Sequence, residues 1–335
     1  MKKVTMQDVA DAVGVSRISI WKAINGRPGV SDALRKQILN KATDMGYLTQ
    51  AKPELPHMKE RTVSVVVSRP ESSSFWMQII HHMAKELARS NINLMYTYMP
   101  SYYKAGYTLP SALSPEATEG FVVLNIYDEK LLEMLAASPL PKVFLDTVPT
   151  VPFSKLSGDL VLLEGRMHIR EITKRLLASG RKNLGFIGDV NYAQTNHDRY
   201  LGFLDAHEEM GIVPDPHSSS IKPIDLRSHY EDISDFLEEL DTMPDAFVCA
   251  SDFIAHYAQR YLTESKCEVP KNFLLTGFDN NMEYPNVAER ITTVDVETSS
   301  LGKRLARKIV FRADYPAASY EASYVASRII FRDNL

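Results

Sequence analysis

The chain of 335 residues has little cysteine and no long apolar segment. Cys249 and Cys267 are its only cysteines, too few for a disulfide framework or a cysteine-based metal site. No apolar run reaches the ~18 residues that a membrane-spanning helix needs. The N-terminus also lacks the apolar stretch of a signal peptide. These absences argue against a disulfide-stabilised secreted domain and a membrane protein, and we expect a cytoplasmic location.

The sequence also lacks the short motifs of common enzyme classes. It contains no P-loop, no Gly-x-Gly-x-x-Gly and no Gly-x-Ser-x-Gly. His81 and His82 are adjacent, so on a helix they point to different faces and cannot easily share a metal ion. Acid–base chemistry by Asp279 near Arg199 would lack an evident activating partner. We therefore expect no catalytic residue, no metal site and no cofactor.

Charge is unevenly distributed along the chain. Residues 1–61 hold 11 Lys and Arg against 6 Asp and Glu, a net charge of +5, whereas the rest holds 27 against 36, a net charge of −9. A protein that met nucleic acid along its whole length would not be acidic over most of it. We expect a small module that meets a polyanion, followed by a larger domain that does not.

The basic first part carries the start and stop signals of three short helices. Thr5 followed by Asp8 predicts a capping box at the start of the first helix, and Gly14 predicts its end. Ser16 and Ser31 predict the starts of a second and a third helix. Helical spacing predicts an inner face for the first and third helices, made of Met6, Val9, Ala10, Val13, Leu34, Ile38, Ala42 and Met45.

The second helix has two different faces. One side, which must be buried, carries Ser19, Ile20, Ala23 and Ile24, and the other carries Arg17, Ile18, Trp21, Lys22 and Asn25. A small domain seldom exposes such apolar groups beside two cations unless that face meets a partner. Arg and Lys donate to guanine O6 and N7, and Ile packs on a thymine methyl, so this face suits the major groove of DNA. The alternative is a solvated cationic helix with a stray tryptophan.

Five short motifs follow one another in this part: Val4-Thr5-Met6-Gln7-Asp8-Val9-Ala10, Gly14-Val15-Ser16, Asn25-Gly26, Val30-Ser31 and Gly46-Tyr47. Together they resemble the headpiece of the LacI/GalR family of bacterial transcription regulators. The resemblance implies that Arg17, Ile18 and Lys22 read bases. The family usually has Ser-Arg where this chain has Trp21-Lys22. The DNA-binding residues implied in this way are Thr5, Ser16, Arg17, Ile18, Ser19, Trp21, Lys22, Asn25, Tyr47 and Leu55.

Residues 48–61 are polar and contain two prolines, a composition typical of a linker. In the family that the headpiece resembles, this region forms a short helix on DNA and inserts a leucine into the minor groove, and Leu55 is the nearest candidate. Pro53 removes an amide donor and Pro56 disfavours helix at Leu55. We expect a weak or absent hinge helix and a smaller bend in bound DNA.

From residue 62 onward, short apolar runs alternate with amphipathic stretches. Continuous apolar strands separated by helices are typical of parallel sheets that are covered on both faces. Because a single sheet of this length would be unusual, we expect two doubly wound lobes with a ligand cleft at the carboxyl ends of the strands. The predicted strands are 63–67, 121–124, 142–145, 184–187, 246–249 and 273–275.

Aromatic and polar side chains follow several of these strands, in Ser72-Ser73-Ser74-Phe75-Trp76, Asp189, Asp198-Arg199, Ser251-Asp252 and Gly277-Phe278-Asp279-Asn280. Aromatic faces stack on sugar rings or purines, Arg donates a planar fork, and carboxylates accept from hydroxyls, so the set suits a small polar ligand. Each residue also has a structural alternative: the core for Trp76, a helix cap for Asp252 and a turn for Asp279.

Further motifs in this second part are Arg199 with Gly202-Phe203, Ser251-Asp252, Val269-Pro270, Gly277-Phe278-Asp279, Thr292-Thr293-Val294 and Leu301-Gly302. They resemble the periplasmic-binding-protein-like core of the same regulators, whose effector is commonly a sugar, a sugar phosphate or a purine. The resemblance implies the effector-binding residues Phe75, Trp76, Thr195, Arg199, Leu226, Asp252 and Asp279. Where the family often has an Asp-Asn pair, this chain has Val161-Leu162-Leu163 before Glu164-Gly165, so a frequent polar anchor is missing.

The sequence thus predicts a helix-turn-helix domain at 1–47, a linker at 48–61 and an effector-binding and dimerisation domain at 62–335. The expected fold is an all-α headpiece joined to a two-lobed α/β core with two doubly wound parallel sheets. The expected function is that of a sequence-specific transcriptional regulator, most often a repressor in this family. Its expected partners are a pseudo-palindromic operator in double-stranded DNA and a small effector, a sugar or sugar phosphate.

Two other functions stay open at this point. One is an activator or a co-repressor-dependent regulator of the same family, and the more remote one is a sugar-processing enzyme fused to a DNA-binding head. A plain sugar receptor would need an export signal and gives the headpiece no role. Tetramers of the family carry an apolar heptad tail, which the segment 331–335 does not provide, so we expect a homodimer.

Overall fold

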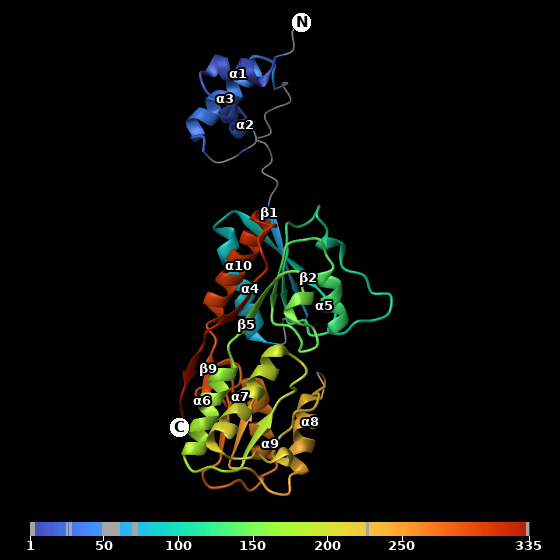
Figure 1. Cartoon of the computed structure of the whole chain (residues 1–335), viewed down its shortest axis with the longest axis vertical. Coiled ribbons are helices and arrows are strands. Elements are labelled where there is room, and N and C mark those ends of the chain that lie inside the picture. Colours follow the sequence, from blue (N-terminus) through green and yellow to red (C-terminus); the bar gives the residue numbers. More distant parts are fainter. Residues whose placement is uncertain are drawn as a thin grey trace. The chain divides into compact units, whose positions relative to one another are not determined.

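The computed structural model describes residues 4–24, 26, 29–48, 61–68, 73–225, 228–332 and 335 (Figure 1). The chain divides after Arg61 into two compact units, here called the headpiece (residues 1–61) and the core (residues 62–335). Residues 49–60 of the predicted linker, which include Pro53, Leu55 and Pro56, lie outside the described residues.

The described residues of the headpiece form three helices, α1 (Met6–Val13), α2 (Arg17–Ile24) and α3 (Asp32–Asp44). The predicted capping box is present, because Asp8 N–H donates to Thr5 Oγ1 and Thr5 N–H donates to the Asp8 carboxylate at 2.7 Å. Gly14 ends α1 at φ 74°, a left-handed conformation that glycine adopts without strain. The small core of the unit is made of Val9, Ala10, Ile20, Ala23, Ile38 and Ala42.

The first lobe of the core, lobe 1, is built on a six-stranded sheet with the order β10-β5-β4-β3-β1-β2. All the pairings from β10 to β1 are parallel. The strands are β1 (Arg61–Val67), β2 (Ile92–Tyr98), β3 (Phe121–Leu124), β4 (Lys142–Leu145), β5 (Asp159–Leu163) and β10 (Ala322–Val325). The strands β3, β4 and β5 are buried throughout, as expected for a sheet covered on both faces.

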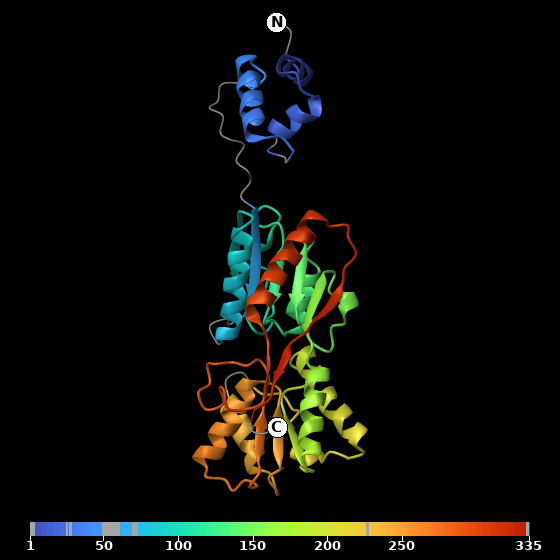
Figure 2. The ribbon, with the colours of Figure 1, turned by 90° about the vertical axis from the view of Figure 1, so that its left-hand side faces the viewer.

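Helices cover both faces of this sheet. On one face, α4 (Ser74–Ala88) and α10 (Thr298–Asp314) lie side by side, as Figure 2 shows. Gly302 permits their close approach, because a Cβ atom at this position would lie 2.6 Å from the Ile79 carbonyl oxygen. On the other face, α5 (Glu129–Ala136) packs Leu131 and Leu135 into a second cluster with Val66.

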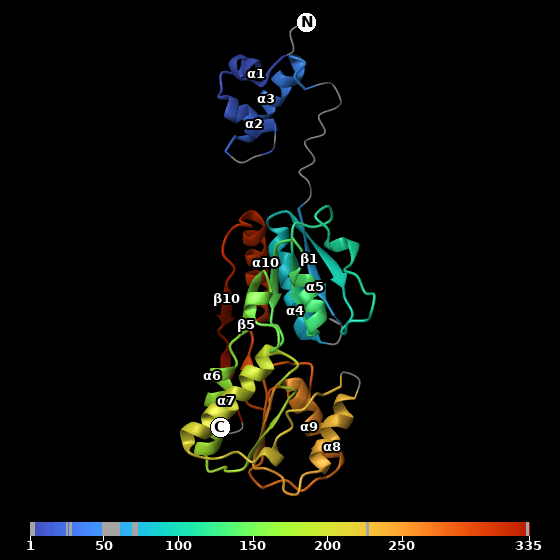
Figure 3. The ribbon, with the colours of Figure 1, turned by 45° about the vertical axis from the view of Figure 1, so that its right-hand side comes forward.

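Lobe 2 has a smaller sheet of three parallel strands in the order β6-β7-β8, and a separate antiparallel pair of β9 with β11. Two helices lie on each side of the three-stranded sheet, α6 with α7 and α8 with α9 (Figure 3). The elements are α6 (Arg166–Ala178), β6 (Leu184–Ile187), α7 (Gln194–Met210), α8 (His229–Glu238), β7 (Ala246–Cys249), α9 (Asp252–Glu264), β8 (Leu274–Thr276), β9 (Thr293–Asp295) and β11 (Arg328–Ile330). Short 3-10 turns are η2 (Ser111–Leu113), η3 (Phe153–Lys155) and η4 (Pro216–Ser218).

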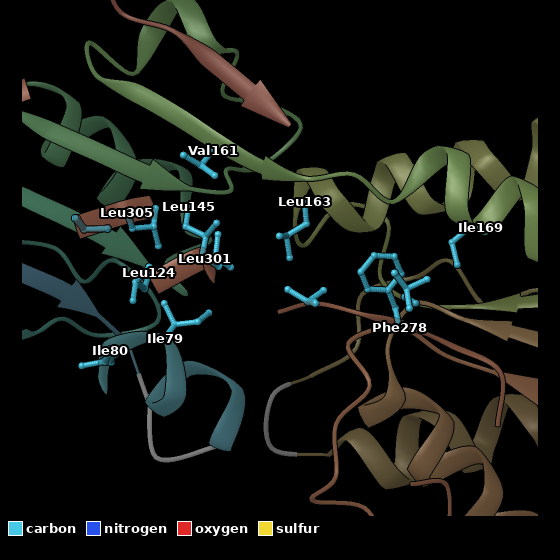
Figure 4. Close-up of a cluster of buried hydrophobic side chains, with 14 of the residues drawn as sticks. Ile79, Ile80, Leu124, Leu145, Val161, Leu163, Ile169, Phe278, Leu301 and Leu305 are labelled. Carbon is cyan, nitrogen blue, oxygen red and sulfur yellow. The ribbon is translucent and has the colours of Figure 1, made fainter. Parts of the chain in front are cut away.

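The chain crosses between the lobes three times, after β5, after β9 and after β10. Apolar side chains continue through this region. Figure 4 shows Leu163, at the end of β5, between the lobe 1 side chains around Leu145 and Leu301 and the Phe278 ring of lobe 2. One hydrophobic cluster therefore spans both lobes.

The six strands predicted from apolar runs are all present, with the last one shifted to Leu274–Thr276. The apolar runs did not predict β2, β5, β9, β10 and β11, although the motif Thr292-Thr293-Val294 lies at β9. The edge strand β2 exposes Tyr96 and Tyr98, so it does not read as a buried apolar run. In β10 no residue is buried, which removes the same signal.

Candidate functional site

The second helix of the headpiece buries the face that the sequence predicts. Ile20 and Ala23 are fully buried and pack in one cluster with Val9 of α1 and Ile38 of α3. Ser19 N–H donates to Ser16 Oγ at 3.1 Å, which satisfies a free amide in the first turn. The packing fixes which side of α2 faces outward.

The outward side of α2 presents two apolar side chains next to cations. The side chains of Ile18 and Trp21 are 67% and 46% exposed, and Arg17 is exposed beside them. Lys22 is half-buried, with its ammonium group beside Gly29. Such a face offers hydrogen-bond donors and a methyl-sized apolar tip to the base edges of a major groove.

The other predicted DNA-binding residues have different surroundings. Thr5 and Ser16 are exposed at helix starts, whereas Ser19 is half-buried and Tyr47 packs against the headpiece core. Two further predicted residues, Asn25 and Leu55, lie outside the described residues.

A cavity of about 420 Å³ lies between the lobes of the core, at the carboxyl ends of their strands. Its size is within the range of small-molecule sites. Lobe 1 lines it with Ser73, Phe75, Trp76, Asn125, Tyr127, Leu145, Asp146 and Leu163. Lobe 2 lines it with Asp189, Tyr192, Ala193, Thr195, Asn196, Arg199, Ile224, His229, Ser251, Phe253, Ile254, Tyr257, Asp279, Asn281 and Tyr284.

Arg199 and Asp279 form the charged centre of the cavity. The Arg199 guanidinium lies 3.6 Å above the Phe278 ring, and its Nη1 donates to the Ala250 carbonyl oxygen at 2.6 Å. Its Nη2 is 3.8 Å from Asp279 Oδ1, too far for a direct hydrogen bond. Burial raises the pKa of Asp279 to about 6, against the opposing effect of Arg199. A ligand hydroxyl beside this pair, within hydrogen-bond distance of both atoms, can accept from the guanidinium and donate to the carboxylate.

Asp146, which the sequence did not single out, joins the lobes. It follows β4 in lobe 1, and its carboxylate accepts from Thr195 Oγ1 in lobe 2 at 2.5 Å. The Thr147 and Thr195 amides also donate to it, at 2.8 and 3.3 Å. Burial raises the pKa of Asp146 to about 6, against these hydrogen bonds. Thr195, predicted as an effector residue, thus lines the cavity and also holds this contact.

Aromatic side chains from both lobes surround the charged centre. Phe75 and Trp76 of α4 meet edge to face at 5.1 Å. The ring centroids of Tyr127 in lobe 1 and Tyr192 in lobe 2 are 4.5 Å apart. A third group includes Phe253, whose ring centroid lies 4.9 Å from that of Tyr257 and 5.8 Å from that of Tyr284. Phe75 and Trp76 were predicted here, and Trp76 also packs on the hydrophobic cluster, as its structural alternative required.

Asp252, predicted as an effector residue, is turned into lobe 2 in this structure. Asp252 does not line the cavity, and both of its carboxylate oxygens are taken by lobe 2 itself. Thr293 Oγ1 and Asn281 N–H donate to them at 2.7 Å each. The residue fixes the segment after β8, while Leu226, also predicted, lies outside the described residues.

The departure at 161–165 makes part of the cavity wall apolar. Leu163 ends β5 and lines the cavity beside Leu145. Glu164 faces elsewhere, because its carboxylate accepts from the Met167 amide at 2.7 Å and lies 2.5 Å from His168 Nδ1. At this point of the described wall, no polar side chain takes the place of the Asp-Asn pair that the family often has.

Within the described ranges, no group of three or more His, Cys, Asp or Glu side chains is arranged to hold a metal ion. The His81 and His82 rings lie edge to face at 5.2 Å. None of the helices in these same ranges is long and apolar enough to cross a lipid bilayer.

Comparison with known proteins agrees with this architecture. A model of the periplasmic binding protein-like domain matches residues 173–333. The HTH-type transcriptional regulator RegA of Clostridium saccharobutylicum is 26% identical over 91% of each chain. The HTH-type transcriptional repressor PurR of Mannheimia succiniciproducens is 25% identical, over 99% of this chain and 98% of its own. These relatives are regulators and not enzymes.

Two solved structures have the same fold along almost the whole chain. The regulator CelR in complex with cellobiose superposes with a TM-score of 0.69 at 22% identity, covering 98% of this chain and 99% of its own. The lac repressor dimer bound to operator and the anti-inducer ONPF gives a TM-score of 0.65 at 17% identity, covering 99% and 98%.

The fold and the two sites define a helix-turn-helix protein with a two-lobed ligand-binding core. The domain match in the second half of the chain and the similarity to these regulators along almost its whole length support the resemblance to the LacI/GalR family of transcription regulators.

Proposed function

We propose that this protein is a transcriptional repressor that binds an operator through α2 and changes its operator affinity when a small polyhydroxylated molecule enters the interlobe cavity. The observation that supports this most directly is the Arg199–Asp279 gap of 3.8 Å inside an aromatic cavity, in a chain that also exposes Arg17 and Ile18 on a short helix. The described lining residues offer binding and orientation to a ligand. Because the similar proteins are transcriptional regulators, we propose no enzymatic activity.

The mechanism follows from contacts that join the lobes. The Asp146–Thr195 hydrogen bond and the bonds from Ser74 N–H to the Glu283 carboxylate, at 2.9 and 3.1 Å, form only when the lobes are close together. An effector that binds this closed arrangement more tightly shifts the equilibrium between lobe positions and so changes the affinity for the operator. Operator DNA must then change the affinity for the effector by the same factor. Two headpieces at a fixed spacing would be needed for a pseudo-palindromic operator, so we propose a homodimer that acts in the cytoplasm.

The direct test selects bound fragments from random duplex DNA with the full-length protein and then adds candidate sugars and sugar phosphates. We expect one enriched palindromic site and release of it by at least one sugar. A ligand that strengthens binding would favour the co-repressor alternative, and stimulation of transcription from the site would favour the activator. No affinity for any duplex at low ionic strength, with or without ligand, contradicts the proposal.

A variant connects the cavity to the response. Arg199→Ala should abolish the effector response and leave operator affinity unchanged, because Arg199 lies in the core and supplies the central donor. Arg199→Lys keeps the charge but not the planar fork, and should retain a weakened response. Full effector response in Arg199→Ala removes this residue from the site.

A further inference from the structure

We infer that the effector is an uncharged saccharide of at least two rings, held between aromatic side chains, and not a sugar phosphate or another anion. The inference rests on the proposed function and specifies the ligand class of the same cavity. It is carried by the balance of charges in the wall, by the state of Arg199 and by the distribution of the aromatic rings.

The described wall carries more negative than positive groups. Its carboxylates are Asp146, Asp189 and Asp279, and its one cation among the described residues is Arg199. Proteins bind phosphate through several donors, with Arg in a bidentate fork or with a helix N-terminus. The net negative charge of this wall disfavours an anion. Asp146 and Asp189 already accept hydrogen bonds from protein groups, which leaves Asp279 as the carboxylate for a ligand donor. Hydroxyl groups supply such a donor without carrying charge.

Arg199 is not available as a free fork. The side chain is buried, with 4% exposure, and one guanidinium nitrogen is already bonded to the Ala250 carbonyl oxygen. The Phe278 ring covers one of its faces. The Nε atom has no hydrogen-bond partner but is buried beside Gly165, which leaves Nη2, 3.8 Å from Asp279 Oδ1, as the donor nearest the carboxylate. This pair offers one donor and one acceptor, the complement of a single hydroxyl group and not of a phosphate.

The cavity also disfavours negative charge on its own groups. Burial raises the pKa values of Asp146 and Asp279 to about 6, although each has partners that favour the ionised form. A phosphate brings about two further negative charges into the same space. Burial in the cavity makes the charged form of these carboxylates less favourable, and it would disfavour a doubly charged phosphate more strongly.

The rings in the wall form three separate groups. Phe75 with Trp76 comes from α4, Tyr127 with Tyr192 bridges the lobes, and Phe253 leads the third group on α9. Aromatic faces pack on the apolar faces of sugar rings. A monosaccharide has two faces, so three groups indicate a ligand with more than one ring. Leu163 adds an apolar surface where the family often has polar anchors.

The test is isothermal titration of the full-length protein with matched sets of ligands. Each set contains a neutral disaccharide (cellobiose, maltose, lactose or sucrose), its component monosaccharides and the corresponding 6-phosphates, and adenine, guanine and hypoxanthine are titrated separately. We expect one disaccharide to bind at least about tenfold more tightly than its monosaccharides and its phosphate, a difference of about 1.4 kcal/mol. A phosphate or purine as the tightest ligand overturns the inference, and so does the absence of binding by every neutral disaccharide.

Variants tie the preference to the aromatic wall. Trp76→Ala should weaken disaccharide binding by about tenfold, whereas Trp76→Phe keeps an aromatic face and should stay within about threefold. Phe311→Ala is the matched control, because this half-exposed ring of α10 is not among the cavity-lining residues. Equal affinities of Trp76→Ala and the control contradict the stacking.

Failure of this inference is separable from failure of the proposed function. Operator binding is measured on the same preparation with the DNA fragment selected above. If the protein releases its operator in response to a sugar phosphate or a purine, the proposed function stands and the ligand class is wrong. If the protein binds no DNA, the disaccharide titration still decides what the cavity holds.

Discussion

Asp146 and Thr195 are 49 residues apart in the chain, yet the carboxylate of the first accepts a 2.5 Å hydrogen bond from the hydroxyl of the second across the two lobes. Both residues are buried. Their neighbours in the chain form a second hydrogen bond between the lobes, since Gln194 N–H donates to the Thr147 carbonyl oxygen at 2.7 Å. The closed arrangement of the cavity thus has a polar contact whose contribution can be measured.

Thr195→Val should lower the free energy of unfolding of the core by about 1–3 kcal/mol, because the substitution removes a donor and leaves a buried carboxylate less satisfied. Thr195→Ser keeps the hydroxyl and should cost less. Urea unfolding followed by circular dichroism provides both values. If the Val variant is as stable as the Ser variant, the interlobe hydrogen bond adds nothing to stability.

A histidine beside the first crossing should make stability depend on pH. His168 Nδ1 lies 2.9 Å from the Glu164 carbonyl oxygen and 2.5 Å from its carboxylate, and Nε2 lies 3.0 Å from the Ser327 carbonyl oxygen near the third crossing. All three neighbours accept, so both ring nitrogens donate in the protonated form. Burial works against protonation, but the hydrogen bonds to Glu164 outweigh it and raise the pKa of His168.

Because the folded pKa is above the unfolded value of about 6.5, the stabilisation by protonated His168 is complete below that pH and is lost as pH rises through the folded pKa. His168→Gln should therefore be less stable than the parent at pH 6, and the difference should shrink by pH 8. Glu164→Gln should remove the same pH dependence. Denaturant unfolding at several pH values measures it, and a difference that is constant with pH would count against this account.

On the headpiece, Arg17→Ala should reduce affinity for the selected operator by about 1–3 kcal/mol and relax the base preference at one position, because Arg17 lies on the exposed face of α2. Lys36→Ala removes the same charge from α3 and serves as the control for general electrostatic attraction. Fluorescence anisotropy with the operator and with single-base variants compares them. Equal losses and equal base preferences would mean that Arg17 contributes only charge.

The ion pair of Arg312 with Asp159 fastens α10 to β5 deep in lobe 1. Arg312 Nη2 lies 2.7 Å from Asp159 Oδ1, and the two side chains are 2% and 1% exposed. Removing one partner leaves a buried charge uncompensated, so Arg312→Met should cost about 3–5 kcal/mol of unfolding free energy. The double variant Arg312→Met with Asp159→Leu should cost less than the two single changes together. Additive losses in thermal or urea unfolding would contradict the coupling.

Much of the headpiece could be predicted from the sequence because its signals are local. The Thr5–Asp8 capping box, the end at Gly14 and the cap at Ser16 each depend on residues within one helical turn. The two faces of α2 follow from helical spacing alone. Local geometry of this kind does not depend on distant parts of the chain.

The cavity was predicted in part, for reasons that are also physical. The rule that ligands sit at strand ends found Arg199, Asp279 and Trp76, and the same rule applied to the strand at 142–145 would have found Asp146. It did not anticipate the orientation of Asp252, because the partner Thr293 is 41 residues away and draws the carboxylate into the lobe. Which way a strand-end side chain turns is decided by such tertiary contacts.

The three crossings also bear on how the protein is made. Leu301, Leu305 and Ile309 of α10 cover one face of the lobe 1 sheet, although they are translated after nearly all of lobe 2. While the ribosome is still adding α10, α4 alone covers that sheet face, and β9 is not yet paired with β11. The nascent chain therefore carries exposed apolar surface in lobe 1 until α10 has been made, which makes this stage open to aggregation and to capture by chaperones.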